Sequence, residues 1–211
     1  MFAKKNKENT ARPAGEYQPP KALSAAFEWT SAAVTALVLI ALIFAFLCRM
    51  VKVEGHSMEP TLYGGDQMLL SSLPYNEPEF GDIVVITGVH EDPLIKRVIG
   101  IPGDYIYINP ADGKVYRNNV ELDEPYIREG IVALKDEKKK IHGTPPHYLT
   151  ERFQVPEGTV FVMGDNRGGS LDSRELAKDA KYDHGCIPLR HVVGKVLYRI
   201  SPDFRSVQYK E

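Results

Sequence analysis

The 211-residue sequence contains only two cysteines, and its formal net charge at pH 7 is only -2. Cys48 and Cys186 are too few for a disulfide framework, and the chain can form at most one disulfide, between these two residues. The 26 basic and 28 acidic residues lack the one-sided positive field of a nucleic-acid-binding protein. With 43% hydrophobic residues, the chain is nonetheless long enough for one or two domains with a buried core.

Loops for phosphate or metal ions are missing too. The stretch VMGDNRGGSLDSRELA (162–177) has neither G-K-[ST] nor a helix-opening G-x-G-x-x-G, so it fits a phosphate loop poorly. Its acidic residues also miss the alternating oxygen spacing of a calcium loop. A tight polar turn braced by Asp-Arg pairs fits better, for instance Asp172 with Arg174 or Asp165 with Arg167. We therefore expect no metal and no cofactor.

Charge of either sign is absent from WTSAAVTALVLIALIFAFLC (29–48), which would span roughly 30 Å as a helix. A buried core helix is one alternative, but such a helix usually keeps a polar side, and this run is apolar on every face. A cleaved signal peptide is another, but the run is long for one, and FAFLCRM offers no small-x-small cleavage site. The sequence predicts a transmembrane helix over residues 27–50 that stays as an anchor.

The orientation of this helix follows from the cations on its two sides. Before the uncharged run 29–48 stand Lys4, Lys5, Lys7, Arg12 and Lys21, and after this run stand Arg49 and Lys52. The excess before the helix predicts a single-pass protein with a cytoplasmic amino terminus and residues 51–211 on the outer face of the cytoplasmic membrane. Residues 1–26 lack apolar periodicity and are expected to form a disordered tail.

Beyond the helix the pattern predicts a mainly β fold. Short apolar runs such as QMLLSS, DIVVIT, DYIYIN and TVFVMG alternate with Gly, Pro, Asn and Asp. DIVVIT is apolar on both faces, which favours a compact barrel or two-sheet body. Residues 109–154, with KDEKKK and HGTPPH, predict an inserted, more exposed subdomain within a core of about 51–108 and 155–202. KDEKKK has the composition of a solvated loop, although contact with anionic lipid stays open.

Ser57 lies in EGHSMEPTL, a context that allows two interpretations. A serine three residues before a proline often only caps a turn. A nucleophilic serine needs a base within hydrogen-bond reach and backbone N–H groups free to hold an oxyanion. The nine residues alone do not decide between a structural and a catalytic role.

A candidate base lies in PLIKRVIGIPGD, where Lys96 and Arg97 interrupt an apolar strand. Alternation places them on opposite faces, so periodicity does not say which cation is buried. Arginine keeps its proton in proteins, whereas a desolvated lysine can become neutral and accept one. Lys96 is therefore the candidate, and its pKa would have to fall by about 3 units. The alternative is a lysine that snorkels from a strand edge.

Four stretches, GHSMEPTL, GDIVVI, KRVIGIPGD and GDNRGGSLDSR, follow the apolar run in this order. Together they resemble the sequence boxes of type I signal peptidases. The resemblance implies a membrane-anchored serine endopeptidase with a mainly β catalytic fold, in which Ser57 is the nucleophile and Lys96 the general base. It also implies supporting residues: Ser170 hydrogen-bonded to the lysine amine, Asp172 paired with Arg174, and Asp165 and Asn166 in the same bracing turn.

The resemblance also implies the partners. Substrates would be signal peptides of exported preproteins, bound as extended strands near Ile83 to Ile86 and Leu94 to Ile95. Shallow apolar pockets would accept small residues such as alanine. The expected substrate-binding residues are Met58, Ile83, Val85, Leu94 and Ile95. The lipid bilayer is the second expected partner, nucleic acid is not expected, and we expect a monomer.

Two positions depart from the family pattern. Some bacterial members carry an oxyanion-binding serine two positions before the nucleophile, where this chain has Gly55, so only the backbone N–H of Ser57 is assigned as a donor. Cys186 has no near partner for the short disulfide of other members. Gly55 and the single span suggest the Gram-positive type. Some relatives use histidine in place of the lysine, but Lys96 is present, so His56 is interpreted as a variable neighbour.

Two other classes stay open on the sequence. A self-cleaving repressor also uses serine and lysine on a related β fold, but it would need a DNA-binding domain where this chain has an apolar run and a short tail. A catalytically silent membrane-anchored binding module would be free to lose Ser57 or Lys96, and both are present.

Overall fold

The computed structural model describes residues 21–71, 73–127, 151–201 and 205–207. The chain divides into an amino-terminal unit that ends at Leu42 and a β-rich unit that begins at Ile43. We describe each unit by itself. KDEKKK and HGTPPH lie outside the described residues, so the expected solvated loop stays a prediction.

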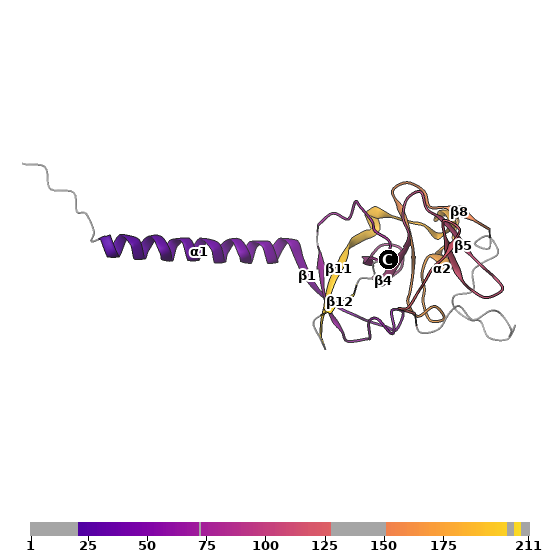
Figure 1. Ribbon diagram of the computed structural model, residues 1–211, viewed down its shortest axis with the longest axis horizontal. Coiled ribbons are helices and arrows are strands. Elements are labelled where there is room, and N and C mark those ends of the chain that lie inside the picture. The colour runs from indigo at the N-terminus through magenta and orange to yellow at the C-terminus, as the bar shows by residue number, and fades with distance from the viewer. Residues whose placement is uncertain (1–20, 72, 128–150, 202–204, 208–211) are drawn as a thin grey trace, which may run out of the picture. The chain divides into compact units, whose positions relative to one another are not determined.

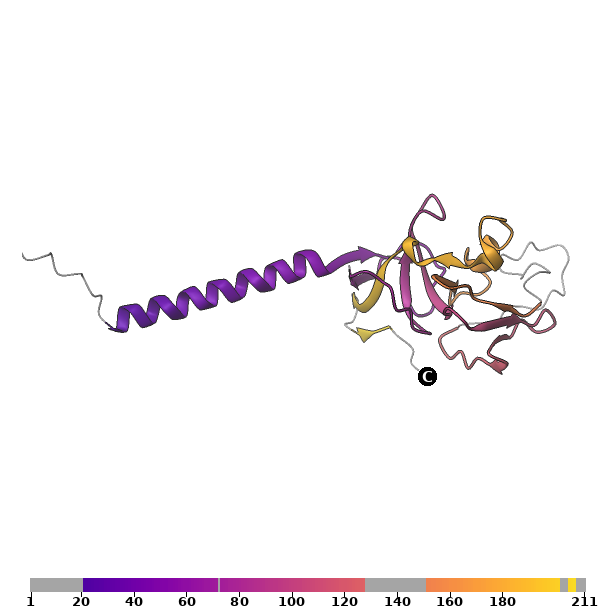
Figure 2. The same ribbon diagram turned by 90° about the horizontal axis from the view of Figure 1, so that it is seen from above.

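Helix α1 runs without interruption from Lys21 to Leu47 (Figure 2). Its stretch Ser24–Leu42 has a mean hydropathy of 1.7 with 0% of it buried, and is long and apolar enough to cross a membrane. The expected tail boundary at residue 26 was wrong, because the alanine-rich stretch before Trp29 joins the helix and prolines 19 and 20 precede it. The helix also ends before residue 50, since the following residues form a strand.

The β-rich unit contains a large sheet and a small one. The large sheet has the order β1-β2-β11-β3-β4-β9-β10, and β12 pairs with β11. Its strands are β1 (Cys48–Lys52), β2 (Gln67–Ser71), β3 (Ile83–Ile86), β4 (Leu94–Gly100), β9 (Thr159–Met163), β10 (Ile187–Pro188), β11 (Val192–Ser201) and β12 (Arg205–Ser206). All of its neighbouring strands are antiparallel. The predicted mainly β fold is confirmed.

The small sheet has the order β7-β6-β5-β8. Its strands are β5 (Tyr105–Ile108), β6 (Val115–Arg117), β7 (Val120–Glu121) and β8 (Phe153–Gln154). The sequence assigned Tyr105–Ile108 to the core, but β5 pairs with β6 and β8 and therefore belongs to the small sheet. Figure 1 shows β5, β8 and α2 (Ser173–Leu176) on one side of the β-rich unit and β1, β11 and β12 on the other.

Buried side chains cover both faces of the central strands. All four residues of β3 are buried, with Ile83 and Val85 in one apolar cluster and Val84 and Ile86 in another. A third cluster joins the small sheet to β4 and β9 through Ile106, Phe153 and Phe161, among others. The described part also has two 3-10 helices, η2 (Asp183–Gly185) and η3 (Leu189–His191). The expected burial of both faces of DIVVIT is present.

Candidate active site

Ser57 lies in the long loop between β1 and β2, half-buried. Backbone hydrogen bonds close the base of this loop, from Val53 N to Asp66 O at 2.8 Å and from Gly65 N to Val53 O at 2.9 Å. Gly55 has φ +83°, a left-handed conformation that glycine adopts without strain. Two residues after this turn, the Ser57 carbonyl accepts a hydrogen bond from the Asn166 N–H at 3.0 Å.

Lys96 projects from β4 and is only 2% exposed. Its Nζ donates to Ser57 Oγ at 2.7 Å and to Ile95 O at 2.8 Å. The two polar groups from distant stretches thus meet at hydrogen-bond distance, the geometry required between a nucleophile and its base. Arg97 is also buried, 1% exposed, so both adjacent cations lie inside the protein, on opposite faces of one strand.

Burial lowers the pKa of Lys96 to about 8 from its ordinary 10.5. The negative charge of Asp172 opposes this shift, whereas the positive charge of Arg174 adds to it. A lysine with this pKa has a substantial neutral fraction near pH 8, and neutral lysine accepts a proton. The electrostatics of the site therefore suit general-base chemistry.

Asp172 is fully buried, and among the surrounding charges its carboxylate has the largest effect on the pKa of Lys96. It forms a two-pronged ion pair with Arg174, with Nε to Oδ1 at 2.9 Å and Nη2 to Oδ2 at 2.7 Å. Oδ2 also accepts from Gly164 N at 2.9 Å. Although burial opposes ionisation, the Arg174 charge and these hydrogen bonds hold the pKa of Asp172 below its usual value. This is the ion pair that the spacing suggested.

Asp165 does not pair with Arg167, so that expected pairing was wrong. Its carboxylate is bound by Arg97, with Nε to Oδ1 at 2.8 Å and Nη2 to Oδ2 at 2.7 Å. Thr61 Oγ1 also donates to it. Arg97 reaches the turn from the neighbouring strand β4, whose register with β9 places Arg97 opposite Met163. Sequence spacing favours local partners, whereas here the sheet supplies one from 68 residues away.

Arg167 instead pairs with Glu124, which follows β7 in the small sheet. The Glu124 carboxylate accepts from both Arg167 Nη atoms, with Nη1 to Oε2 at 2.7 Å. The two side chains are 1% and 8% exposed. Beside them, Tyr126 lies with its ring centroid 4.1 Å from the Arg97 guanidinium. No motif in the sequence points to Glu124 and Tyr126, because their stretch has the composition of an exposed insertion.

Ser170 is buried, and its hydroxyl forms no hydrogen bond with Lys96; the carboxylate of Asp172 is the neighbouring group on which it acts. The expected Ser170–lysine bond is therefore not formed here. The surroundings are crowded: a Cβ at Gly164 would lie 2.2 Å from Ser170 Oγ and 2.5 Å from Ser57 O. Only glycine permits the end of β9 to approach both serines.

His56 turns away from the pair formed by Ser57 and Lys96. Its side chain is 78% exposed, and Nδ1 lies 2.6 Å from Glu59 Oε1. The backbone carbonyl of His56, and not its ring, faces the bracing turn and accepts from Asn166 Nδ2 at 3.0 Å. The ring therefore contacts its own loop, in agreement with its interpretation as a neighbour.

The candidate substrate-binding residues divide between two faces. Met58, Ile83, Val85 and Ile95 belong to one apolar cluster, whereas Leu94 packs in the cluster on the opposite face of β4. β3 pairs with β4 and β11 on its two sides, so most of its backbone has no room for a further strand. β4 is different, because its pairing with β9 begins only at Arg97.

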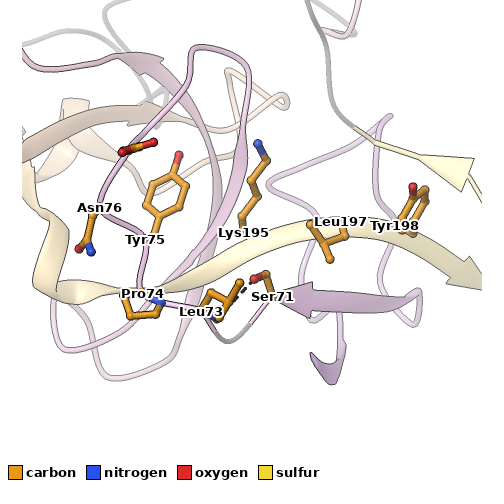
Figure 3. Close-up of a pocket in the computed structure, with 9 residues that line it drawn as sticks. Ser71, Leu73, Pro74, Tyr75, Asn76, Lys195, Leu197 and Tyr198 are labelled. Atoms are coloured by element: carbon orange, nitrogen blue, oxygen red, sulfur yellow. Dashed lines mark hydrogen bonds between the residues drawn. The ribbon is translucent and has the colours of Figure 1, made fainter. Parts of the chain in front are cut away.

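A hollow of about 480 Å³ lies elsewhere, between the end of β2, the following loop and β11. Figure 3 shows Tyr75 and Lys195 side by side at this hollow. Both reach the Asp82 carboxylate, Tyr75 Oη at 2.7 Å and Lys195 Nζ at 2.6 Å. Neither Ser57 nor Lys96 lines it, so it is separate from the candidate active site. In the described ranges, no group of three or more His, Cys, Asp or Glu side chains forms a metal site.

Comparison with known proteins identifies the family of this chain. A family model described as "Signal peptidase, peptidase S26" matches residues 26–201. The chain belongs to this signal peptidase family. It is 40% identical to a signal peptidase I of Bacillus licheniformis over 70% of this chain and 77% of that protein. It is 30% identical to signal peptidase IB of Staphylococcus aureus over 86% and 92% of the two chains.

A crystal structure of a signal peptidase I from Enterococcus faecalis is 26% identical, with a TM-score of 0.39, over 56% of this chain and 96% of that one. Membership of the signal peptidase family makes the chain a serine peptidase that acts in signal-peptide cleavage. The predicted enzyme class is therefore confirmed. The single long apolar helix in the described part fits membrane anchoring of such an enzyme.

Proposed function

We propose that this signal peptidase is anchored by α1 and cleaves preproteins with Ser57 as nucleophile and Lys96 as general base. The observation that carries the proposal is the 2.7 Å hydrogen bond from the buried Lys96 Nζ to Ser57 Oγ. Neutral Lys96 takes the hydroxyl proton as Ser57 attacks the scissile carbonyl. An acyl-enzyme forms when the C–N bond breaks and Lys96 gives this proton to the leaving amine, which makes the lysine neutral again. Lys96 then activates the water that hydrolyses the ester.

The oxyanion is held by the backbone N–H of Ser57, which donates to no other backbone group in the described part of the chain. Gly55 brings no hydroxyl to this place. A missing donor can cost on the order of 100-fold in rate, so a second N–H or a substrate-induced adjustment is expected to help. Asp165, Asp172 and Arg174 support the site by fixing the turn and the charge around Lys96, and Ser170 supports it by packing beside Gly164.

The substrate lies as an extended strand along Leu94–Ile95, whose edge away from β3 is not paired with β9. Backbone hydrogen bonds to this edge hold the signal peptide without reading its sequence. The apolar cluster of Met58, Ile83, Val85 and Ile95 lines the pocket for its small side chains, while Leu94 supports the strand from the opposite face. One chain supplies both Ser57 and Lys96, so a monomer is sufficient.

The first test is cleavage of a preprotein by the detergent-solubilised full chain. Lys96→Ala and Ser57→Ala should each lower the rate by at least about 100-fold, because each removes one half of the reacting pair. His56→Ala is the control, and its rate should stay within about twofold, since the ring is exposed and bonded to Glu59. Full activity of Lys96→Ala together with inactivity of His56→Ala would refute the assignment.

The orientation is proposed from the cations before α1, with the β-rich unit on the outer face of the cytoplasmic membrane. Protease added to intact spheroplasts should digest the β-rich unit and spare an amino-terminal epitope tag. Protection of the β-rich unit under the same conditions would reverse the orientation.

A further inference from the structure

Two residues of the small sheet reach the turn that supports Ser57. Glu124 and Tyr126 follow β7, and the Tyr126 hydroxyl donates to Glu124 Oε1 at 2.9 Å. Glu124 binds both Nη atoms of Arg167, while the Tyr126 ring stacks on the Arg97 guanidinium at 4.1 Å. One short segment therefore contacts both arginines of the site.

Each of these arginines is linked to Ser57 or Lys96 through one neighbouring residue or one hydrogen bond of the turn. Arg167 Nε donates to Gly164 O at 3.2 Å, and in the same turn the backbone N–H of Asn166, the residue before Arg167, donates to Ser57 O at 3.0 Å. Arg97 follows Lys96 directly in β4 and holds Asp165 in the same turn. The turn is thus held from both sides while it contacts the backbone of Ser57.

The charge balance makes Glu124 difficult to replace. Arg167 is 1% exposed, and a buried cation that loses its partner retains its full desolvation cost. The other carboxylate whose charge acts on Arg167 is Asp165. Asp165 is already bound by Arg97, so without Glu124 the two arginines would compete for one carboxylate. Such competition would shift the turn against which Ser57 rests.

We infer that Glu124 is a positioning residue of the active site and that Tyr126 assists it. Through Arg167 and Arg97 they fix the turn at Gly164–Arg167, and through that turn the alignment of Ser57 with Lys96. The small sheet is therefore part of the catalytic framework. This inference rests on the proposed roles of Ser57 and Lys96.

Steady-state cleavage of a preprotein by the full chain in detergent tests the inference. Glu124→Gln keeps the shape of the side chain and removes its charge. It should lower kcat by about tenfold or more and leave KM within about twofold, because small misplacements of reacting groups cost rate more than binding. Tyr126→Phe, which loses only the hydroxyl bonded to Glu124, should lower kcat by about threefold.

A double-mutant cycle with Arg167→Gln identifies the pair as the cause. Because the double variant leaves no unpaired buried charge, its loss in kcat should be smaller than the product of the two single losses. Simple multiplication of the losses would contradict the proposed coupling.

Two controls separate positioning from general stability. Ile108→Ala removes a buried side chain of the small sheet, and Glu121→Gln removes an exposed carboxylate three residues from Glu124. Ile108→Ala should lower Tm, Glu121→Gln should leave Tm unchanged, and both should keep kcat within about twofold when assayed below their Tm.

An unchanged kcat of Glu124→Gln below its Tm would overturn the inference. If Glu124→Gln does not fold, Glu124→Asp and Tyr126→Phe decide in its place, and unchanged kcat in both would have the same meaning. Failure of the proposed function would look different, since Ser57→Ala would then retain cleavage. The inference alone fails if Ser57→Ala is inactive and the Glu124 and Tyr126 variants are fully active.

Discussion

Lys96 is a buried amine whose protonation the protein controls with opposite charges. Burial disfavours the ammonium form, and Arg174 disfavours it further, while Asp172 and Asp165 favour it. The carboxylates are themselves bound by Arg174 and Arg97, so much of their charge is compensated. Desolvation therefore dominates, and the pKa of Lys96 falls to about 8.

The pH dependence of catalysis should follow this pKa. In the proposed mechanism the neutral amine is the active form, so kcat/KM of the full chain should rise from acid pH and level off above about pH 8. Below that value it should fall about tenfold per pH unit. The measurement is a pH-rate profile on a peptide substrate without titratable groups near the cut. A rate independent of pH between 6 and 9 would exclude Lys96 as the base.

Stability should depend on pH for the same reason. Because the folded-state pKa of Lys96 is about 8, below the ordinary 10.5 of an unfolded chain, unfolding takes up a proton between these two pH values, and below about pH 8 burial of the charged amine lowers stability by the full amount. Lys96→Met, which removes the buried amine, should therefore raise the free energy of unfolding at pH 7, by up to about 3 kcal/mol. The gain should shrink as pH rises from about 8 to 10.5. Urea unfolding of both proteins across this range measures it, and a constant difference would argue against a lowered pKa.

At the scale of elements, the turn after β9 depends on the absence of a side chain at Gly164. A Cβ there would meet Ser170 Oγ at 2.2 Å and Ser57 O at 2.5 Å, so Gly164→Ala must displace one of the two serines. We expect kcat to fall by at least about tenfold, with a lower Tm. Gly168→Ala is the matched control, because its added methyl meets nothing within 4 Å. Equal activities of the two variants would show that the close approach is not needed.

The same turn shows which features the sequence could predict. The Asp172–Arg174 pair was predictable, because the two residues are near neighbours along the chain. The partners of Asp165 and Arg167 were not, since strand register brings Arg97 to one and the small sheet brings Glu124 to the other. Ser57 and Lys96 were found through the chemistry their stretches allow and through the family resemblance. The distance of 2.7 Å between Lys96 Nζ and Ser57 Oγ, by contrast, could not be predicted, because it depends on how the loop after β1 folds against β4.

The start of the small sheet was mispredicted for a related reason. DYIYIN alternates like the core strands, and alternation reports that one face is buried without saying against which sheet. Ile106 does join a buried cluster, but among the strands that the structure describes, β5 pairs only with β6 and β8. Pairing partners of short strands depend on long-range packing that local patterns do not encode.

At the scale of the whole molecule, α1 is expected to raise the rate of preprotein cleavage by raising the local concentration of enzyme and substrate at the membrane. With the proposed anchor, the enzyme is confined to the same surface as a preprotein held in the bilayer by its apolar segment, and this confinement should raise the effective concentration of each for the other. The anchor should therefore matter for membrane-bound substrates and not for short soluble peptides.

Deletion of residues 1–47 tests whether α1 affects the cleavage of membrane-bound substrates alone. The variant keeps β1, whose pairing with β2 runs from Cys48 to Lys52 and supports the loop that carries Ser57. Cleavage of a short soluble peptide should stay within about threefold of the full chain, since Ser57, Lys96 and Glu124 are all retained. Cleavage of a preprotein in liposomes should fall by at least about tenfold, because the shared surface is lost. If both substrates lost activity equally, α1 would be needed for the fold of the β-rich unit; if neither did, anchoring would not contribute to the rate.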